Sequence, residues 1–402
     1  MELLLWIWTG LMLTTLVVWG SRHVQISLAG RRMAPLTEGT FPIDVASLPS
    51  VSFIVAGKDE EANIETCLTS MLSQDYPSLQ VISANDRSTD ATGPIMDRVA
   101  STTSLLTVIH VKELPAGWLG KNNAMRTAVE RATGEWFCFT DADCTQVSKR
   151  SLRTAMNYAL AGKLDFLSVL PAHDAQSFWE SVVQPACSGI MMIWFNPMKV
   201  NDPKSRAAYA NGAFMLMSRA CYEAIGRHEA VRAEFNEDMH MARLAKEKGL
   251  RLRVVQNEGL YHVRMYGSLK ATWAGWSRIF FGCFGTLRRL LLAMAAVSYA
   301  SLLPWVTLAV SGLVMAGGNA GEPWRWLLFA SACSCVTQTT VMWRFYALNH
   351  TPAWYGTLYP LGAVIGLGAL FNAIRRLRNR ATITWRGTTY AAAGASPVGQ
   401  RG

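Results

Sequence analysis

The sequence predicts an α/β protein: a mostly parallel β-sheet with helices on both faces, flanked by transmembrane helices. Two observations carry this prediction. Short β-rich apolar runs alternate with helical stretches through the middle of the chain, which indicates successive βαβ units. Uncharged apolar stretches near both ends of the chain are long enough to cross a bilayer.

Four apolar runs are the predicted strands, and each is apolar on both faces, as in sheets that helices cover on both sides. They are Val51–Ala56, Leu79–Ala84, Leu105–Val111 and Trp136–Thr140. The helical stretches between them are Glu60–Ser73, Asp90–Ala100 and Asn122–Ala132. Ligands bind beyond the carboxyl ends of the strands in such sheets, so the polar residues there are candidate site residues.

The first apolar stretch, Leu3–Gly20, is a predicted membrane span of 18 residues. A cleavable signal peptide is the alternative, but Glu2 precedes the stretch and the basic residues come after it, which is the reverse of a signal peptide. Arg22, Arg31 and Arg32 directly after the span favour an outside N-terminus and a cytoplasmic position for the chain from residue 21 onward.

Three further candidate spans are Leu290–Ala316, Trp326–Leu348 and Tyr355–Ile374. The middle one is the weakest, because six Ser, Thr and Gln residues lie in its interior. Three crossings from a cytoplasmic domain would place Arg375 and the arginines after it outside, against the positive-inside rule. Either one segment is re-entrant or the rule fails here, and we favour a cytoplasmic tail.

The charge distribution argues against a nucleic-acid-binding protein. The 402 residues include 38 basic and 28 acidic side chains, a net charge of +10. Residues 41–280 are neutral, with 25 of each, whereas the last 28 residues hold six arginines and no acid. Basic residues beside apolar stretches are typical of membrane flanks. The half of the chain that is hydrophobic also excludes a disordered protein.

Acidic residues follow three of the predicted strands: Glu60 the first, Asp86 the second, and Asp141 with Asp143 the fourth. No GxGxxG or GxxxxGK[ST] motif is present, so neither a dinucleotide dehydrogenase nor a P-loop NTPase is expected. Without a glycine-rich loop, a bound diphosphate needs a cation, and carboxylate oxygens suit Mg²⁺ or Mn²⁺. The alternative for Asp86, Asp90 and Asp143 is helix N-capping.

Four ordered motifs resemble the family 2 glycosyltransferases of GT-A fold. They are VSFIVAGKDEEANIETCLTSMLSQDYPSLQVISANDRSTDAT from residue 51, LPAGWLGKNNA from residue 114, FTDADC from residue 139 and NEDMHMARL from residue 236. The resemblance covers roughly residues 48–280 and is greatest to membrane-anchored bacterial members similar to hopanoid-associated and ceramide-glucosyltransferase-like enzymes. It implies a nucleotide-diphospho-sugar-binding domain that uses a UDP-sugar and Mg²⁺ or Mn²⁺.

The resemblance also implies roles for individual residues. On the donor side, Glu60 and Asp86 would hold the uridine, Lys121 would lie near the base or diphosphate, Asp141 would contact the ribose and diphosphate, and Asp143 would bind the metal. On the acceptor side, Asp238, beside Glu237, would be the catalytic base, and Gly212, Ala213 and Phe214 would form part of the pocket.

Several of these residues have a second interpretation. Glu237 and Asp238 precede the helical stretch Met239–Lys248, where acidic residues favour a helix N-terminus without any catalytic role. Four residues later in the chain could grip the diphosphate or line an acceptor channel, or could belong to an interfacial amphipathic helix. They are Arg264, Trp273, Trp276 and Arg278.

Two departures from the family pattern matter: Ala56 and Asn85 stand where the family often has Pro and Asp. The Q-x-x-R-W signature of processive synthases is also missing, which favours transfer of a single sugar. We therefore expect an inverting glycosyltransferase of the cytoplasmic membrane, with a cytoplasmic catalytic domain, a lipid hydroxyl as acceptor and no nucleic-acid partner. A processive polysaccharide synthase and a non-catalytic membrane scaffold are the alternatives.

The expected organisation has four parts. Residues 1–21 are an anchor, 45–280 the catalytic domain, 288–374 a membrane region of two to three spans and 375–402 a basic tail. Interfacial helices are expected near residues 178–195 and 268–285.

Overall fold

The computed structural model describes residues 2–40, 48–318, 321–378, 383–385 and 388–390. The chain divides into two compact units. The helical unit comprises Met1–Arg32, Ala175–Trp194 and Tyr266–Asn379, and the sheet unit comprises Met33–Asp174, Phe195–Met265 and Arg380–Gly402.

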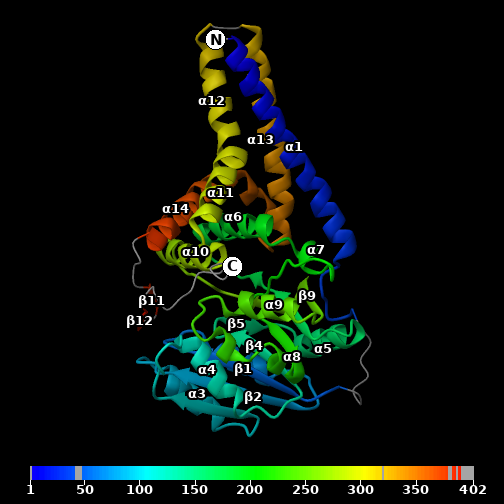
Figure 1. Cartoon of the computed structure of the whole chain (residues 1–402), viewed down its shortest axis with the longest axis vertical. Helices are drawn as coiled ribbons and strands as arrows, with labels where there is room; N and C mark the ends of the chain where they lie inside the picture. The colour runs from blue at the N-terminus through cyan, green and yellow to red at the C-terminus, as the bar shows by residue number, and fades with distance from the viewer. Residues whose placement is uncertain (1, 41–47, 319–320, 379–382, 386–387, 391–402) are drawn as a thin grey trace. The chain divides into compact units, whose positions relative to one another are not determined.

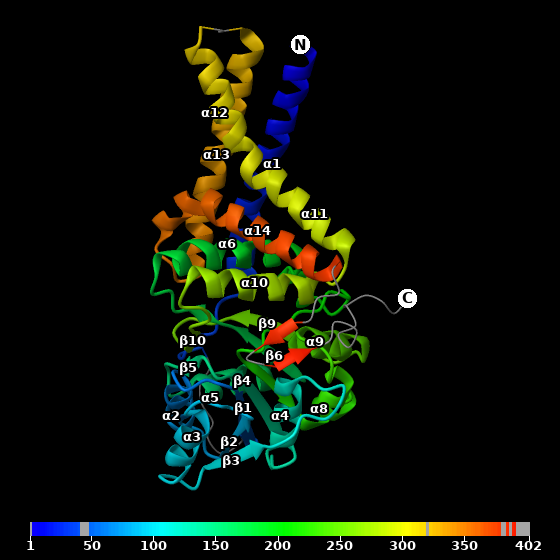
Figure 2. The same ribbon diagram turned by 90° about the vertical axis from the view of Figure 1, so that its left-hand side faces the viewer.

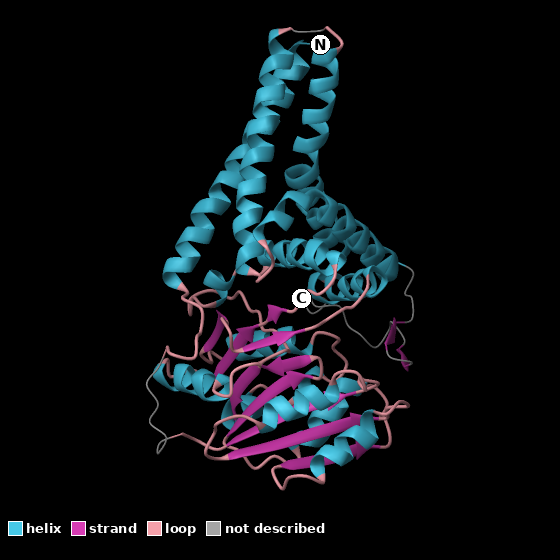
Figure 3. Cartoon of the chain, turned by 180° about the vertical axis from the view of Figure 1, so that it is seen from behind, coloured by secondary structure: helices cyan, strands magenta, loops and turns pink. Residues whose placement is uncertain are grey.

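The sheet unit is built on a seven-stranded mixed sheet, drawn in magenta in Figure 3, with the order β3-β2-β1-β4-β8-β6-β9. Only β8 runs antiparallel to its neighbours. The strands are β1 (Val51–Gly57), β2 (Leu79–Asp86), β3 (Leu106–Val111), β4 (Trp136–Asp141), β6 (Phe166–Leu170), β8 (Met215–Ser218) and β9 (Leu252–Gln256). The predicted α/β class with a mostly parallel sheet is confirmed.

Helices cover both faces of this sheet because successive strand residues point to opposite sides. In β1, Phe53 and Val55 belong to one buried cluster, and Ile54 belongs to another. The first cluster contains residues of α2 (Ile64–Leu72), α3 (Thr92–Ala100) and α5 (Ser151–Ala161). The second contains residues of α4 (Gly120–Val129), α8 (Arg219–Ala224) and α9 (Glu237–Glu247).

A smaller sheet has the order β5-β10-β7 and consists of Cys144–Gln146, Tyr261–Val263 and Ala172–His173. Two short strands of the predicted tail, β11 (Ile383–Trp385) and β12 (Thr388–Tyr390), pair antiparallel. The rest of that tail after Arg378 lies outside the described residues. The remaining short elements of the sheet unit are α7 (Pro197–Val200) and η2 (His228–Val231).

In the helical unit, α1 (Glu2–Arg32), α12 (Leu303–Ala316) and α13 (Glu322–Leu348) pack lengthwise as a bundle (Figure 1). Helices α1 and α13 run parallel, since Leu5 packs with Leu327 while Thr15 donates to Ser334 Oγ at 3.0 Å. Helix α12 runs antiparallel to α1. Trp8 Nε1 donates to Thr307 Oγ1 at 3.1 Å, and Trp19 Nε1 donates to the earlier Ala300 O at 2.7 Å.

The bundle contains a polar contact at η3 (Ser298–Leu302), a π-helical turn between α11 (Leu287–Val297) and α12. The buried Gln338 of α13 donates to the carbonyl oxygens of Ala300 and Ser301 at 3.3 and 3.2 Å. A π-helical turn breaks the regular α-helical hydrogen-bond pattern, and side chains of both neighbouring helices bond these carbonyls.

Helices α6 (Phe178–Trp194), α10 (Leu269–Phe284) and α14 (Tyr359–Arg378) form a separate layer of the helical unit (Figure 2). Helices α6 and α10 are joined by Trp276 Nε1, which donates to Gln184 Oε1 at 2.6 Å. Helix α14 approaches α6 closely at Gly362, where a Cβ atom would lie 2.7 Å from Val182 O. The short helix η4 (Ala353–Leu358) links α13 to α14.

Among the residues that the structure describes, three helical segments are long and apolar enough to cross a membrane: Glu2–Arg32, Leu287–Ala316 and Ala353–Arg378. They include the first, second and fourth stretches that the sequence marked as candidate spans. The stretch marked as the weakest forms the 27-residue helix α13, with Ser331, Ser334 and Gln338 buried. Length and composition alone do not place α13 among the candidate spans.

Candidate active site

Three of the predicted acidic residues lie at the same edge of the main sheet. Asp86 is the last residue of β2 and Asp141 the last residue of β4, and both strands flank β1 in parallel register. Glu60 follows β1, and its backbone N donates to Thr92 Oγ1 at 2.7 Å. The strand order therefore assembles the acidic strand ends that the sequence singled out.

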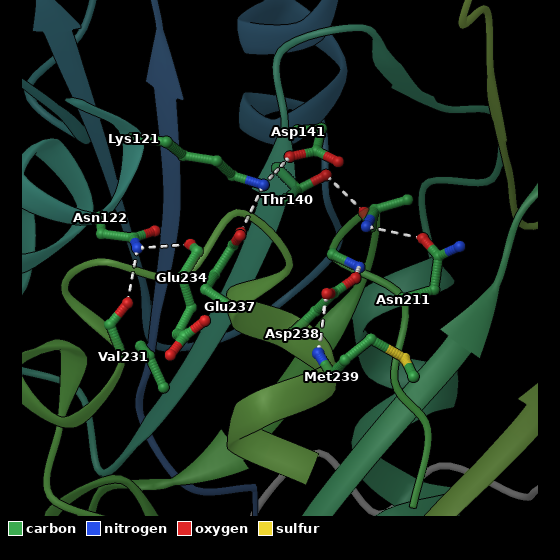
Figure 4. A network of polar contacts seen from close by, with 12 residues as sticks. Lys121, Asn122, Thr140, Asp141, Asn211, Val231, Glu234, Glu237, Asp238 and Met239 are labelled. Atoms are coloured by element: carbon green, nitrogen blue, oxygen red, sulfur yellow. Dashed lines mark hydrogen bonds and ion pairs between the residues drawn. The ribbon is translucent and has the colours of Figure 1, made fainter. Parts of the chain in front are cut away.

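Lys121 joins this edge to helix α9, as Figure 4 shows. Its Nζ lies 2.6 Å from Asp141 Oδ1 and 2.6 Å from Glu237 Oε1. Burial acts to lower the pKa of Lys121, but the two carboxylates outweigh it and hold that pKa well above its usual value. The lysine is therefore charged, and it brings together residues from α4, β4 and α9.

Asp238 lies in the first turn of α9, where two backbone amides fix its carboxylate. Oδ2 accepts a hydrogen bond from Gly212 N at 2.9 Å, and Oδ1 accepts one from Met239 N at 2.7 Å. The N-cap position itself belongs to Asn236, whose side chain makes no capping hydrogen bond. Asp238 thus supports the helix start, as the alternative interpretation expected, but also contacts a loop 26 residues earlier in the chain.

The protonation of Asp238 is unusual for an aspartate. Burial, and after it the negative charge of Glu237, raises the pKa of Asp238 to about 7, although Lys121 and the two amides act in the opposite direction. A carboxylate with this pKa can accept a proton near neutral pH, which an ordinary aspartate does poorly.

Gly212 is the point at which the lysine and both aspartates come closest together. A Cβ atom on this residue would lie 3.3 Å from Lys121 Nζ, 3.5 Å from Asp141 Oδ2 and 3.6 Å from Asp238 Oδ2. The neighbouring Ala213 O accepts a hydrogen bond from Thr140 Oγ1 at 2.7 Å. Asn211 Oδ1 accepts one from Ala213 N at 3.0 Å. This loop is therefore anchored on β4, one residue before Asp141.

Asn122 is a site residue that the sequence reasoning missed. Its buried Nδ2 donates to the backbone oxygens of Val231 and Glu234 at 2.8 and 2.9 Å (Figure 4), and to Arg232 O at 3.3 Å. These bonds hold the loop that leads into Glu237 and Asp238. The only signal in the sequence is that Asn122 directly follows Lys121 in the GWLGKNNA motif.

Asp143 and Arg264 are brought together by the small sheet, since Arg264 N donates to Asp143 O at 3.2 Å. The Asp143 side chain is half-buried. Burial, followed by the charges of Asp143 and Glu60, raises the pKa of the Cys67 thiol. In the described part of the chain, no three His, Cys, Asp or Glu side chains lie close enough together to hold a metal ion by themselves.

The carboxylates of this site fit a cation that is held partly by the protein and partly by the substrate. Mg²⁺ is usually bound by one or two carboxylates together with substrate phosphates, and carboxylate oxygens are the ligands that Mn²⁺ also prefers. Asp143 can supply such an oxygen, whereas Asp141 already pairs with Lys121.

The structure gives a reason for Asn85, one of the departures from the family pattern. Asn85 Nδ2 lies 3.1 Å from His110 Nδ1, and His110 Nε2 lies 2.9 Å from Asp97 Oδ1. The amide of Asn85 can donate to this ring nitrogen, which an ionised aspartate at the same position could not do. Asn85 Oδ1 accepts from Ser88 N at 3.2 Å. This chain uses Asn85 to hold the loop after β2, where Asp86 pairs with Arg87 at 2.8 Å.

The remaining predicted residues belong to the core of the sheet unit or to the helical unit. Phe214 is buried in the core, with its ring beside those of Phe53 and Tyr261. Trp273, Trp276 and Arg278 belong to α10 in the helical unit. There, Trp276 is buried against Gln184, while Trp273 packs over Gly368.

Comparison with known proteins identifies the domain that carries this site. Residues 52–226 match the model of Glycosyl transferase family 2. The chain carries a family 2 glycosyltransferase domain. The resemblance on which the sequence analysis relied is confirmed, and with it the nature of the protein as an enzyme.

Among curated proteins, the 4,4'-diaponeurosporenoate glycosyltransferase of Staphylococcus aureus strain USA300 is 27% identical over 266 residues, 65% of this chain and 69% of that protein. Among solved structures, the mannosyltransferase PcManGT from Pyrobaculum calidifontis, in complex with GDP-Man and Mn²⁺, is 20% identical with a TM-score of 0.49. That match covers 84% of this chain and 99% of the other.

A glucosyl-3-phosphoglycerate synthase from Mycobacterium tuberculosis, in complex with Mn²⁺ and uridine-diphosphate-glucose, is 15% identical with a TM-score of 0.41. This match covers 64% of this chain and 86% of the other.

The Lys121 contacts predict a non-additive effect on stability. Lys121→Met leaves the buried Glu237 without its cation, so the variant should lose about 3 kcal/mol of unfolding free energy. Adding Glu237→Gln removes the uncompensated charge, and the double variant should regain part of that loss. Thermal unfolding in detergent measures both.

Lys112→Met, at an exposed lysine that follows β3, is the control and should leave the melting temperature unchanged. A double variant that melts below Lys121→Met would contradict the predicted coupling.

Proposed function

We propose that this glycosyltransferase moves a single sugar, with inversion, from a UDP-sugar to a hydroxyl group of a membrane lipid. The observation that carries the proposal is Asp238, a carboxylate fixed by two amides beside the Lys121–Asp141 pair. Inverting transfer needs such a base on the acceptor side and positive charge on the diphosphate side.

The donor half of the reaction falls to the strand-end residues. Glu60 and Asp86 would bind the uridine, and Asp141 the ribose and diphosphate, with Lys121 and Arg264 near the phosphates. Asp143 would hold a divalent cation, which when bound stabilises charge on the leaving diphosphate. When a donor enters, Lys121 is already charged and held by Glu237, so it needs little reorganisation to face a phosphate.

The acceptor half falls to Asp238 and the Gly212 loop. As the acceptor oxygen attacks the sugar carbon, Asp238 would take the hydroxyl proton. The hydrogen bonds from Gly212 and Met239 orient its carboxylate for this step. Because Gly212 has no side chain, nothing is inserted between Lys121, Asp141 and Asp238, which would all lie within 3.6 Å of a Cβ atom at this position.

The relative from Staphylococcus aureus supports a lipid-like acceptor, since its name gives a carotenoid acid. It also raises a second candidate, a lipid carboxylate. A carboxylate is ionised at neutral pH, so its attack on a sugar needs no base. The raised pKa of Asp238 favours the hydroxyl acceptor, because a base works best with a pKa near the working pH.

We also propose a topology for the helical unit: α1, α12 and α13 cross the membrane, and α14 lies at its surface. The first three pack lengthwise through Trp8, Thr15 and Trp19, whereas α14 packs in the layer with α6 and α10 (Figure 2). Three crossings from an outside N-terminus would leave the sheet unit and Arg375 in the cytoplasm, in accord with the positive-inside rule. Neither the re-entrant segment nor the exception to the rule is then needed.

The metal role of Asp143 can be tested by binding. Asp143→Asn removes a hard anionic ligand, so it should abolish Mn²⁺-dependent binding of UDP-sugar without lowering the melting temperature. Calorimetric titration with UDP-sugar, with and without Mn²⁺, measures this. Glu65→Gln, at an exposed ion pair with Arg98, is the matched control. Unchanged Mn²⁺ dependence in Asp143→Asn would refute the assignment.

The base role of Asp238 predicts both a mutational and a pH effect. Asp238→Asn should lower turnover with a hydroxyl acceptor by about 10²–10⁴ and leave donor affinity unchanged. Asn can accept only one of the two amides that Asp238 accepts, so a small fall in melting temperature is expected. For the wild type, kcat/KM should fall tenfold per pH unit below about 7, where Asp238 is protonated.

Release of UDP, measured with hydroxyl lipids and carboxylate lipids, separates the two acceptor classes. Glu237→Gln serves as a comparison variant and should move the inflection to lower pH, because Glu237 raises the pKa of Asp238. Loss of turnover in Asp238→Asn only with hydroxyl lipids supports the base. Near-normal turnover with hydroxyl lipids would leave Asp238 a structural residue.

The proposed topology predicts cysteine accessibility. A cysteine at Ser101, an exposed residue of the sheet unit, should resist an impermeant thiol reagent in intact cells and react after permeabilisation. A cysteine at the exposed Gly321, before α13, should react in intact cells. The native cysteines are buried except for the half-buried Cys333, so a Cys333→Ser background gives low labelling. The reverse pattern would overturn the orientation.

A further inference from the structure

We infer that the ends of α10, α11 and α14 form a binding surface for acidic phospholipids. Six arginines make up this arginine cluster: Arg278 on α10, Arg288 and Arg289 on α11, and Arg375, Arg376 and Arg378 on α14. The five arginines of α11 and α14 have no role in the proposed sugar transfer. The inference therefore does not depend on the proposed function.

The contacts within the helical unit bring these arginines together. Asn372 Nδ2 of α14 donates to Ser277 Oγ of α10 at 3.2 Å. Arg376 lies one turn after Asn372, and Arg278 directly follows Ser277, so the two half-buried arginines share this crossing and their charges interact. Two like charges held this close to each other are mutually unfavourable.

Helix α11 adds its arginines to the same place. Ser301, after α11, bonds Tyr359 at the start of α14 at 2.7 Å, and the two helices run antiparallel from this contact (Figure 2). Measured from this contact, Arg288 lies about 20 Å away along α11, and residue 372 lies about the same distance away along α14. The first turn of α11 is then close to the last turn of α14.

The helical unit as a whole is strongly basic. It contains 12 basic and three acidic side chains, a net charge of +9. The three acidic residues stand near the starts of helices. Glu2 and Glu322 lie at the starts of α1 and α13, at the end of the bundle away from the arginine cluster. Glu180 lies in the first turn of α6, near Gly362 at the start of α14. Arg288 and Arg289 also stand in the first turn of a helix, where the helix dipole disfavours cations. An external anion would relieve both unfavourable arrangements.

Exposed apolar side chains identify the kind of anion. Leu291 and Leu292 of α11 are 49% and 48% exposed, and Phe371 of α14 is 54% exposed. They lie within one turn of Arg288 and Arg375, respectively. Arginines bind phosphate in a bidentate manner, and adjacent apolar side chains enter the acyl region of a bilayer. A soluble anion or a nucleic acid would gain nothing from these apolar side chains. An acidic phospholipid pairs with the arginines through its phosphate and covers the apolar side chains with its acyl chains.

The test measures lipid binding to the full-length protein in neutral detergent. Phosphatidylglycerol and phosphatidylcholine with the same acyl chains are titrated, and native mass spectrometry gives the apparent Kd of each. We expect the wild type to bind phosphatidylglycerol at least about tenfold more tightly, and Arg375→Gln/Arg378→Gln to weaken that binding about tenfold or more. Phosphatidylcholine binding should not change.

Matched variants separate charge from folding. Arg375 and Arg378 are exposed, so their double variant should keep the wild-type melting temperature. Arg278→Lys/Arg376→Lys preserves the charge of the half-buried pair and should keep most of the preference, which Arg278→Gln/Arg376→Gln should lose. Arg325→Gln changes an exposed arginine of α13, one turn from Glu322, and should have no effect.

Equal affinity of the wild type for the two lipids would overturn the inference. A loss of preference in Arg325→Gln as large as in the cluster variants would do so as well. Glycerol phosphate tests whether a soluble anion occupies the site. If it competes with phosphatidylglycerol at similar concentrations, the cluster is a site for free anions and not a lipid-binding surface.

Discussion

One half-buried positive charge holds the catalytic edge of the sheet unit together. Lys121 pairs with Asp141 at the end of β4 and with Glu237 at the start of α9, which are nearly a hundred residues apart in the chain. Without the lysine, two carboxylates and the adjacent Asp238 would repel one another in a poorly solvated place. With it, the same residues keep one negative group with a pKa near neutrality. Lys121 thus fixes the shape of the site, while burial and the charge of Glu237 raise the pKa of Asp238 against its influence.

Parts of this site can be predicted from the sequence because they depend on local periodicity. Apolar runs predict the strands, and parallel strands end at one edge, so Asp86 and Asp141 had to lie near each other. The roles of Asn122 and Gly212 cannot be predicted in this way, because they depend on atoms 109 and 26 residues away. Asn85 is a departure from the family pattern, and the histidine it contacts lies on β3, 25 residues further on.

The helical unit shows the corresponding limit for membrane segments. Hydropathy ranks α14 above α13 as a span, because Ser331, Ser334 and Gln338 lower the value for α13. Those polar side chains bond partners inside the bundle, which a sum over residues does not register. Helix α14 is apolar because it packs on α6 and α10, with Gly362 and Gly366 against α6. Composition alone therefore does not distinguish an apolar face that meets protein from one that meets lipid.

The π-helical turn η3 has a consequence for the mechanics of the bundle. Trp19 from α1 and Gln338 from α13 both bond carbonyl oxygens of this turn. Under the proposed topology water is excluded from this region, so a broken hydrogen bond finds no replacement. If α1 or α13 slid by one residue along its axis, its bond to this turn would break. The lengthwise register of the three helices is therefore fixed. The bundle should therefore be rigid and keep a fixed length. A thicker or thinner bilayer would have to be accommodated by tilting of the bundle or by deformation of the lipid.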